Sequence, residues 1–124
     1  DEQLVGAMPL YLKQHSYGEF VFDWSWAQAY EQQGLNYYPK VLCAIPFTPV
    51  QGSRILCKSE TDQNALIDGL KSLLSANGLS SAHILFPMAT EAEQLKAQGF
   101  LLRDSVQFHW HNQDFQSFEQ FLLR

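Results

Sequence analysis

The chain has 124 residues, of which 46% are hydrophobic and 17% charged, and its formal net charge is -5. This size and composition predict one globular domain and exclude an intrinsically disordered chain. No apolar run approaches the roughly 20 residues that a membrane helix needs. The eight basic residues are spread along the chain, without the basic stripe that is typical of nucleic-acid surfaces.

Cysteine usage and the two termini bear on the cellular context. Cys43 and Cys57 lie in apolar runs with neither a CxxC pair nor zinc-like spacing. We expect two buried free thiols and a reducing, cytoplasmic compartment. The polar residues 1–3 do not open a signal peptide. Because apolar runs lie close to both ends, we expect a fragment of a longer protein, with exposed apolar surface that favours dimerisation.

Hydrophobic periodicity and turn residues predict alternating strands and helices. Pro9 places the first strand at a sheet edge or on a bulge, because proline cannot donate to a ladder. The clearest helix carries an apolar stripe and stops at Asn77-Gly78. The predicted strands cover residues 4–12, 53–58, 82–86, 100–103 and 106–111, the predicted helices cover 26–33, 61–76, a short stretch between Thr90 and Gly99, and 115–123, and residues 41–46 fit a strand or a short helix.

Helix starts are predicted from capping residues. Ser25 and Gln28 match one capping box, and Thr90 and Glu93 match a second. Thr61 can cap the helix between them. The predicted order from residue 53 onward is therefore β-α-β-α-β-β-α, which indicates an α/β domain.

Two sets of residues carry a family resemblance. The stretch from Glu93 to Gly99-Phe100, followed by two apolar strands, resembles the end of the GNAT acyltransferase fold. The aromatic-rich stretches resemble, more specifically, the FemAB-like branch of uncharacterised bacterial proteins, over nearly the whole chain. They are His15 to Trp26, Tyr37 to Lys40, Pro46 to Val50 with Arg54, and Gln107 to Trp110.

The resemblance implies a GNAT-like α/β fold, a mixed sheet with flanking helices, present here as an incomplete unit and as one domain over residues 1–124. Members of this branch resemble two such units in tandem, and their best-known relatives transfer amino acids from aminoacyl-tRNA onto peptidoglycan precursors. The implied activity is aminoacyl or N-acyl transfer, in which an acceptor amine attacks an activated acyl group. The implied donor is acyl-CoA or aminoacyl-tRNA, with tRNA held through regions outside this segment.

Two places depart from the pattern of GNAT enzymes that use acetyl-CoA. Residues 58–64 stand where those enzymes have a Gly-rich turn whose amides cradle a pyrophosphate, yet they contain no glycine and carry two carboxylates. Leu95 stands where many of those enzymes have a tyrosine general acid, and leucine has no proton to donate. We therefore expect no ordinary CoA chemistry within this unit.

The residues between 15 and 30 form the first candidate site. A cleft with aromatic planes and a few carboxylates suits a polar ligand that bears amines or a sugar. Glu19 or Asp23 is expected to act as general base toward the acceptor amine if burial raises its pKa. The alternative is that the aromatics form core and the carboxylates cap turns. The expected acceptor-binding residues are His15, Tyr17, Trp24, Trp26 and Tyr30.

Arg54 is the expected anion contact. It follows the Pro-Phe-Thr-Pro loop, and its guanidinium suits a substrate carboxylate or phosphate. The alternative for Arg54 is an ion pair with a nearby acid. The same two alternatives apply to Lys40, which would bind a substrate anion or pair with an acidic residue of the protein itself.

Gln107 and His109 share one face of a predicted strand, where they are expected to line a substrate groove. His109 and His111 would suit a metal ion if another ligand joined them. A solvent-facing or hydrogen-bonded strand is the favoured interpretation, so no metal site is assigned. His83 is expected to be a hydrogen-bonded histidine of the core.

Two other functions stay open beside the transferase. One is a non-catalytic binding module, which keeps an aromatic cleft for a cell-wall fragment or a peptide. The other is a structural half of a tandem acyltransferase, whose aromatic residues are buried against the second unit. Binding without turnover would favour the first of these.

Overall fold

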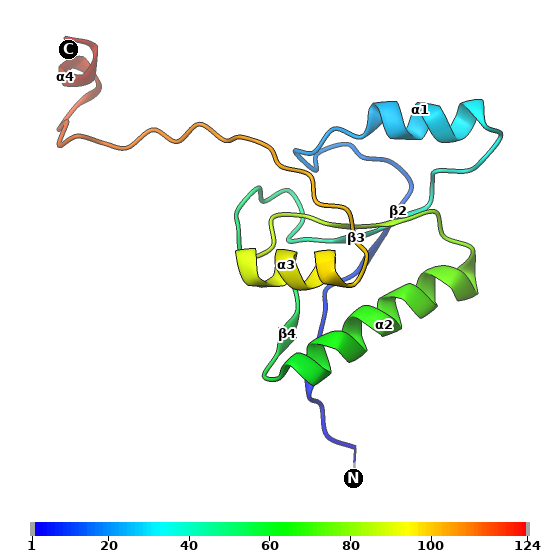
Figure 1. Ribbon diagram of the computed structural model, residues 1–124. Coiled ribbons are helices and arrows are strands. Elements are labelled where there is room, and N and C mark those ends of the chain that lie inside the picture. The colour runs from blue at the N-terminus through cyan, green and yellow to red at the C-terminus, as the bar shows by residue number, and fades with distance from the viewer. Residues whose placement is uncertain (1, 124) are drawn as a thin grey trace.

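The computed structural model describes residues 2–123, which form short strands and helices around a small mixed sheet (Figure 1). This mixed α/β arrangement agrees with the predicted fold class. The elements are β1 (Gly6–Ala7), β2 (Tyr11–Lys13), α1 (Trp24–Gln32), β3 (Lys40–Cys43), β4 (Leu56–Cys57), α2 (Glu60–Asn77), β5 (Ala82–Ile84), α3 (Ala89–Ala97) and α4 (Phe118–Leu122).

Two small sheets lie at the centre of the fold. β1 pairs with β4 in an antiparallel ribbon. In the second sheet β3 is central, antiparallel to β2 and parallel to β5. The parallel pair is extended at its ends, where Val41 N–H donates to the Ser81 carbonyl and Leu85 N–H donates to the Cys43 carbonyl. The connection from β3 to β5 passes through β4 and α2.

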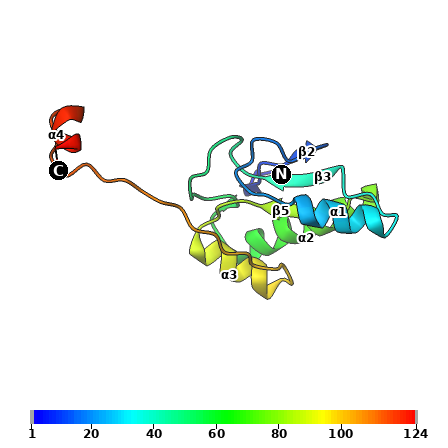
Figure 2. The same ribbon diagram turned by 90° about the horizontal axis from the view of Figure 1, so that it is seen from above.

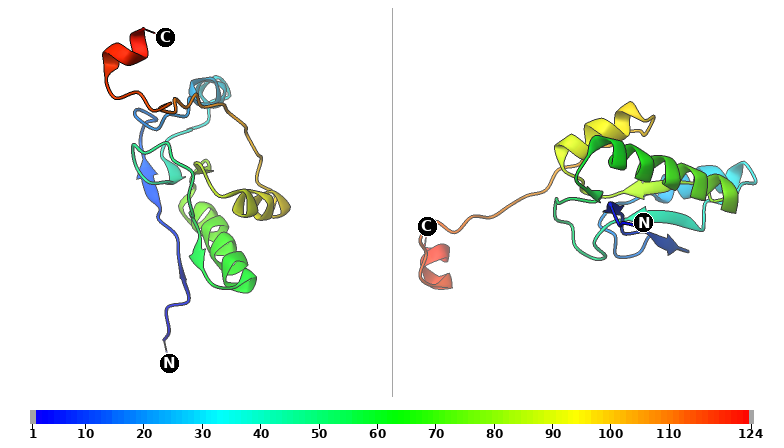
Figure 3. Two further views of the ribbon diagram at one scale, coloured as in Figure 1. Left: turned by 90° about the vertical axis from the view of Figure 1, so that its left-hand side faces the viewer. Right: turned by 90° about the horizontal axis from the view of Figure 1, so that it is seen from below.

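The register of the three-stranded sheet assigns side chains to its two faces. Lys13 lies opposite Lys40, so the two lysines share one face. Val41 and Cys43 point to the other face, which α2 and α3 cover together (Figures 2 and 3). Residues 14–23, which we call the aromatic loop, contact the first face through hydrogen bonds to Lys40.

An apolar core fills the space between the sheets and the helices. Ile55, Ile67 and Leu95 are its buried centre. Both cysteines are free, as predicted, but only Cys43 is fully buried. Burial raises the pKa of the Cys43 thiol to about 12. The half-buried residues that pack around the core are Met8, Cys57, Leu66, Ile84 and Phe100.

α2 is the helix that the sequence predicts best. It covers Glu60–Asn77 and ends at Gly78, whose φ of 60° lies in the left-handed region. Its cap is Ser59 rather than Thr61, because the Ser59 hydroxyl accepts a hydrogen bond from the Asp62 amide. The predicted centre and end of this helix are confirmed.

The two predicted capping boxes are wrong. α1 begins after Asp23, which makes no side-chain capping bond, because Lys40 and Tyr37 bond to its carboxylate instead. α3 has Met88 at its N-cap, and the Glu91 carboxylate accepts a hydrogen bond from the Met88 amide. A contact from elsewhere in the fold has therefore overridden the local capping pattern at α1, whereas a local contact, from the Met88 amide to the Glu91 carboxylate, caps α3.

The predicted strands are shorter in the structure, and two of them do not form. Residues 4–12 divide into β1 and β2 on either side of Pro9, and residues 53–58 retain only β4. Residues 100–103 and 106–111 belong to no strand, because no neighbouring strand within residues 2–123 pairs with them. This part of the chain is extended and leads away from the sheet to α4 (Figure 1).

The aromatic loop comes close to the chain after β3 at Gly18. Its φ of +80° lies in the left-handed region, and a Cβ there would lie 2.7 Å from Cε1 of Phe47. Only glycine satisfies both constraints without strain. Phe20, in the same loop, also has a positive φ, of 58°. The shape of this loop is therefore held by its contacts rather than by its own backbone preferences.

We predict that Gly18→Ala lowers the free energy of unfolding by about 2 kcal/mol, because the new methyl group meets Phe47 in a disfavoured backbone conformation. Gly69→Ala is the matched control. Gly69 lies inside α2 with no atom within 4 Å of its Cβ position, so this change should add about 1 kcal/mol. Urea denaturation of both variants checks the prediction, and equal shifts would contradict it.

Candidate functional site

A buried lysine lies at the start of β3. Lys40 is 1% exposed, and its ammonium donates hydrogen bonds to Ser16 Oγ at 2.8 Å, Glu19 Oε2 at 2.9 Å and Asp23 Oδ2 at 2.8 Å. All three acceptors belong to the aromatic loop. A buried cation of this kind is stable only when its charge and its hydrogens are paired. One ammonium therefore holds the loop against the sheet.

Tyr37 extends these contacts toward β5. Its hydroxyl donates to Asp23 Oδ2 and lies 3.1 Å from His83 Nε2. The same nitrogen lies 2.9 Å from the Ser81 hydroxyl oxygen. His83 is thus hydrogen-bonded, as the sequence predicts, but it is half-buried and lies outside the apolar core. The group that we call the lysine cluster consists of Ser16, Glu19, Asp23, Tyr37 and Lys40.

Burial and charge set the protonation states in and beside the lysine cluster. Burial acts to raise the pKa of Asp23, but hydrogen bonds from Lys40, Ser16 and Tyr37 lower it to about 2. Burial, followed by the hydrogen bond to Asp23, raises the pKa of Tyr37 well above its usual value. Burial and the charge of Lys40 lower the pKa of His83. At neutral pH these groups are a carboxylate, a phenol and a neutral imidazole.

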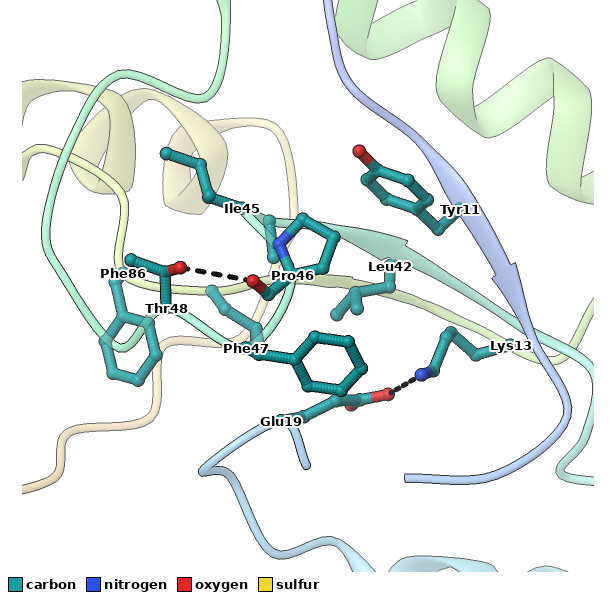
Figure 4. Close-up of a pocket in the computed structure, with 11 residues that line it drawn as sticks. Tyr11, Lys13, Glu19, Leu42, Ile45, Pro46, Phe47, Thr48 and Phe86 are labelled. Carbon is teal, nitrogen blue, oxygen red and sulfur yellow. Dashed lines mark hydrogen bonds and ion pairs between the residues drawn. The ribbon is translucent and has the colours of Figure 1, made fainter. Parts of the chain in front are cut away.

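A pocket of about 210 Å³ opens beside Glu19 on the same face of the sheet (Figure 4). Lys40 holds Oε2 of this carboxylate, whereas Oε1 is buried and has no hydrogen-bond partner among residues 2–123. The ammonium of Lys13 lies 3.6 Å from Oε1. The other lining residues are Tyr11, Leu42, Ala44, Ile45, Pro46, Phe47, Thr48, Leu85 and Phe86.

Three phenylalanines around this pocket have a strained backbone. Phe47 and Phe86 line the pocket with φ values of 58° and 53°, and Phe20, next to Glu19, has a φ of 58°. A bulky side chain in the left-handed region is uncommon and destabilising. Such residues cluster at binding and catalytic sites, where contacts from the rest of the structure maintain them. The strain supports this pocket as the candidate functional site.

The aromatic residues predicted to bind the acceptor lie outside the pocket. His15, Tyr17 and Trp24 form a chain of ring contacts, with centroid separations of 5.3 Å and 5.2 Å. These rings lie on the exposed side of the aromatic loop and the start of α1. Tyr30 packs edge-on against Tyr37, at 5.3 Å between ring centroids. The residues predicted for the first candidate site therefore do not form one cleft. Three of the rings form an exposed stack, whereas the two carboxylates are buried.

A larger groove, of about 980 Å³, runs along the outer side of β5. Residues 81–87 line it together with parts of α3 and residues 99–105. Trp26 also lines it, and the guanidinium carbon of Arg103 lies 5.3 Å from the centroid of its ring. His83 belongs to this groove, whereas Glu19 belongs to the smaller pocket. The lysine cluster thus lies between two concave surfaces.

Arg54 lies inside the protein, with none of its surface exposed. Its guanidinium donates to the carbonyl oxygens of Leu85, at 2.8 Å, and Val50, at 2.7 Å. It forms no ion pair within residues 2–123. The Glu91 carboxylate instead accepts hydrogen bonds from the backbone amides of Arg54 and Ile55. Arg54 therefore fixes the chain after β3 to the end of β5.

Gln107 and His109 lie on the extended segment. The Gln107 amide donates to the Pro49 carbonyl at 2.9 Å, and His109 Nε2 lies 3.2 Å from the Gln107 amide oxygen. The rings of His109 and His111 are 6.3 Å apart. Within residues 2–123, no three His, Cys, Asp or Glu side chains come close enough together to hold a metal ion.

Sequence reasoning did not identify Tyr37, Ser16 or Lys13 as residues of the site. The available signal was Lys40, which opens an apolar run, because a lysine in a buried strand needs an acidic partner. Two acidic residues of this chain supply that pairing, which is the alternative that the sequence analysis left open for Lys40. Which acids do so depends on the fold, since they lie 17 and 21 residues away.

No helix within residues 2–123 is both long and apolar enough to cross a membrane. Comparison with curated proteins finds no match, and comparison with solved structures finds none either. Residues 1–124 match the FemAB-like family, which is described as peptidoglycan biosynthesis/recognition. This family implies a GNAT-like fold, to which a mixed α/β arrangement is suited. Because the match covers the whole sequence, this chain belongs to the FemAB-like family.

Proposed function

We propose that this chain forms part of an acyl-transfer site, in which an acceptor amine attacks the activated acyl group of an aminoacyl-tRNA. The proposed acceptor is a peptidoglycan-precursor-like molecule. Membership of the FemAB-like family supports peptidoglycan-related aminoacyl transfer. The observation that carries the proposal is Oε1 of Glu19, a buried oxygen beside a pocket with no hydrogen-bond partner among residues 2–123.

Glu19 is the proposed general base. As the neutral amine nitrogen bonds to the acyl carbonyl carbon, the nitrogen gives a proton to Oε1. The bond from that carbon to the leaving oxygen then breaks, and Glu19 gives the proton to this oxygen, which leaves as the tRNA hydroxyl. Lys40 holds the other oxygen of the same carboxylate, so Oε1, which has no hydrogen-bond partner among residues 2–123, is the oxygen left to react. The apolar walls of the pocket lower the local dielectric, which strengthens the interaction between Glu19 and a positively charged nitrogen.

Asp23 is proposed to position other groups rather than to remove the proton. Its Oδ2 accepts hydrogen bonds from Lys40 and Tyr37, and Asp23 is absent from the residues that line the pocket. A carboxylate with a pKa of about 2 is also a weak base at neutral pH. Asp23 then acts through Lys40, which in turn orients Glu19.

We predict that Glu19→Gln lowers kcat for acyl transfer by about 100-fold or more, because the amide cannot accept the amine proton. KM for the acceptor should change much less. Asp23→Asn should keep more activity than Glu19→Gln, and Glu31→Gln, an exposed change on α1, is the control for general effects of charge. Steady-state kinetics with labelled aminoacyl-tRNA measures these effects. Unchanged kcat in Glu19→Gln would remove Glu19 from the mechanism.

Asp23 also makes the stability of the protein depend on pH. Its folded pKa of about 2 lies below the ordinary 3.8, so the carboxylate stabilises the fold fully above about pH 4 and loses this effect as the pH falls through 2. We predict that Asp23→Asn lowers the free energy of unfolding at pH 7 by about 2 kcal/mol. Urea denaturation should show that the difference from the wild type shrinks toward pH 2. A difference independent of pH would contradict this.

The start of α2 supports aminoacyl-tRNA over acyl-CoA as the donor. In this position a phosphate group would need free amides and little negative charge. Ser59 already caps the helix, and Glu60 and Asp62 lie in its first turn. Leu95 lies buried in the core, where it has no proton to donate. The surroundings of this helix end are therefore unfavourable for a pyrophosphate.

We predict saturable binding of aminoacyl-tRNA to the protein and none of acetyl-CoA, since the carboxylates at the start of α2 repel a pyrophosphate. Isothermal titration calorimetry with each ligand measures this, with deacylated tRNA as the control for binding of the RNA alone. Stoichiometric binding of acetyl-CoA would show that the donor assignment is wrong.

The exposed ring stack favours a second function, a non-catalytic binding module. His15, Tyr17 and Trp24 form an aromatic surface that suits the apolar faces of sugars or peptide side chains. A cell-wall fragment could bind there outside the pocket that Glu19 lines. Binding of such a fragment that is never acylated would favour this function over the transferase.

A further inference from the structure

The buried charges beside the pocket are one positive charge short of neutrality. Glu19 and Asp23 carry two negative charges, and Lys40 supplies one positive charge. All three side chains are almost completely buried. An uncompensated charge in such surroundings is strongly destabilising. A second cation is therefore favoured beside Glu19, the member of the cluster that lines the pocket.

Lys13 supplies that cation, but with poor geometry. Its ammonium lies 3.6 Å from Glu19 Oε1, which is too far for a good hydrogen bond. It also lies opposite Lys40 in the register of β2 and β3, where like charges repel. β2 is an edge strand, and the Lys13 side chain remains 19% exposed. Lys13 can therefore leave this position for water when another cation takes its place beside Glu19.

The pocket offers a better-placed cation a complete set of contacts. Glu19 Oε1 needs a donor, and the ring of Phe47 lies beside the place that the Lys13 ammonium now occupies, at 5.8 Å from it (Figure 4). An ammonium over an aromatic ring is stabilised by the charge distribution of the ring. Leu42 and Ile45 add apolar walls. These features suit a primary ammonium at the end of an unbranched aliphatic chain.

We propose that Lys13 is the resting occupant of a cation site in this pocket and leaves Glu19 when a primary ammonium ligand enters. Lys13 then determines specificity, because a ligand has to replace its charge as well as fill the apolar space. The inference extends the proposed function, on which it rests for the identity of the acceptor as an amine. In the proposed function, Glu19 Oε1 pairs with the ammonium form of the acceptor on binding. The acceptor then loses one proton to water, and the neutral amine that attacks gives a second proton to Glu19.

The test measures binding of a simple probe, without any acyl donor. n-Pentylammonium is titrated into the 15N-labelled protein, and chemical shifts near the pocket are followed by NMR. Lys13→Met should bind the probe about fivefold tighter than the wild type, which is the effect of one partly exposed ion pair. Lys13→Gln should behave like Lys13→Met, and Lys13→Arg should behave like the wild type.

Three controls separate charge from general effects. Lys58→Met, an exposed change beside β4, should leave the affinity unchanged. 1-Pentanol, which has the same chain length and no charge, should bind all variants equally. Glu19→Gln added to Lys13→Met should abolish the gain. Equal affinity of the wild type, Lys13→Met and Lys13→Gln for n-pentylammonium would overturn the inference, and so would the absence of any binding.

The outcome is separable from that of the proposed function. If Glu19→Gln retained acyl transfer while Lys13→Met still bound the probe more tightly, the general base would be elsewhere and the cation site would stand. If Glu19→Gln lost acyl transfer and removal of Lys13 had no effect on probe binding, the base would stand and the role of Lys13 would be wrong.

Discussion

The arrangement of this site depends on the buried ammonium of Lys40. Its three hydrogen bonds join β3 to a loop that has no helix or strand of its own. Removing a cation from water is strongly unfavourable unless charged partners replace the water. The loop must therefore bring Glu19 and Asp23 to Lys40 together, and this requirement fixes the wall of the pocket. The strained backbone of Phe20 is acceptable in such a loop because contacts, rather than local preference, hold it in place.

The two faces of the small sheet are stabilised by different physics. α2 and α3 cover one face through apolar contacts around Ile67 and Leu95, which tolerate changes of shape but carry no chemistry. The other face has a smaller apolar cluster of Leu42, Ala44 and Leu85. Beside this cluster, the charge pairs and hydrogen bonds of Lys40 hold the aromatic loop, and they demand fixed geometry. Two buried carboxylate oxygens on this side, Glu19 Oε1 and Asp23 Oδ1, have no hydrogen-bond partner among residues 2–123. Such exceptions in native structures call for an explanation, and a catalytic role is one such explanation. The candidate site lies where the apolar cluster and the charged side chains of this face meet.

The sequence predicted those parts of the fold that local interactions determine. α2 is an example, because its apolar stripe and Gly78 lie within one continuous segment. The two carboxylates were also predicted as candidate site residues, and the structure brings both of them to Lys40. The sequence could not show that Lys40 would bond to both of them, or that Tyr37 would bond to Asp23, 14 residues away, and to His83, 46 residues away. Those contacts depend on strand register, and a shift of one residue would reverse the face on which each side chain lies.

The segment that contains Val106, Phe108 and Trp110 is a case in which the sequence predicts an element that the structure does not have. Its alternation of apolar and polar residues is typical of a strand, yet Phe108 is 99% exposed and no strand forms there. Alternation specifies which face of a strand is to be buried, but the strand itself exists only when a neighbour supplies hydrogen bonds. The outer edge of β5 has its hydrogen-bonding groups toward a groove rather than toward another strand of the described sheet. The alternating pattern is therefore compatible with the structure, because a strand needs a second segment to pair with and the pattern describes only one.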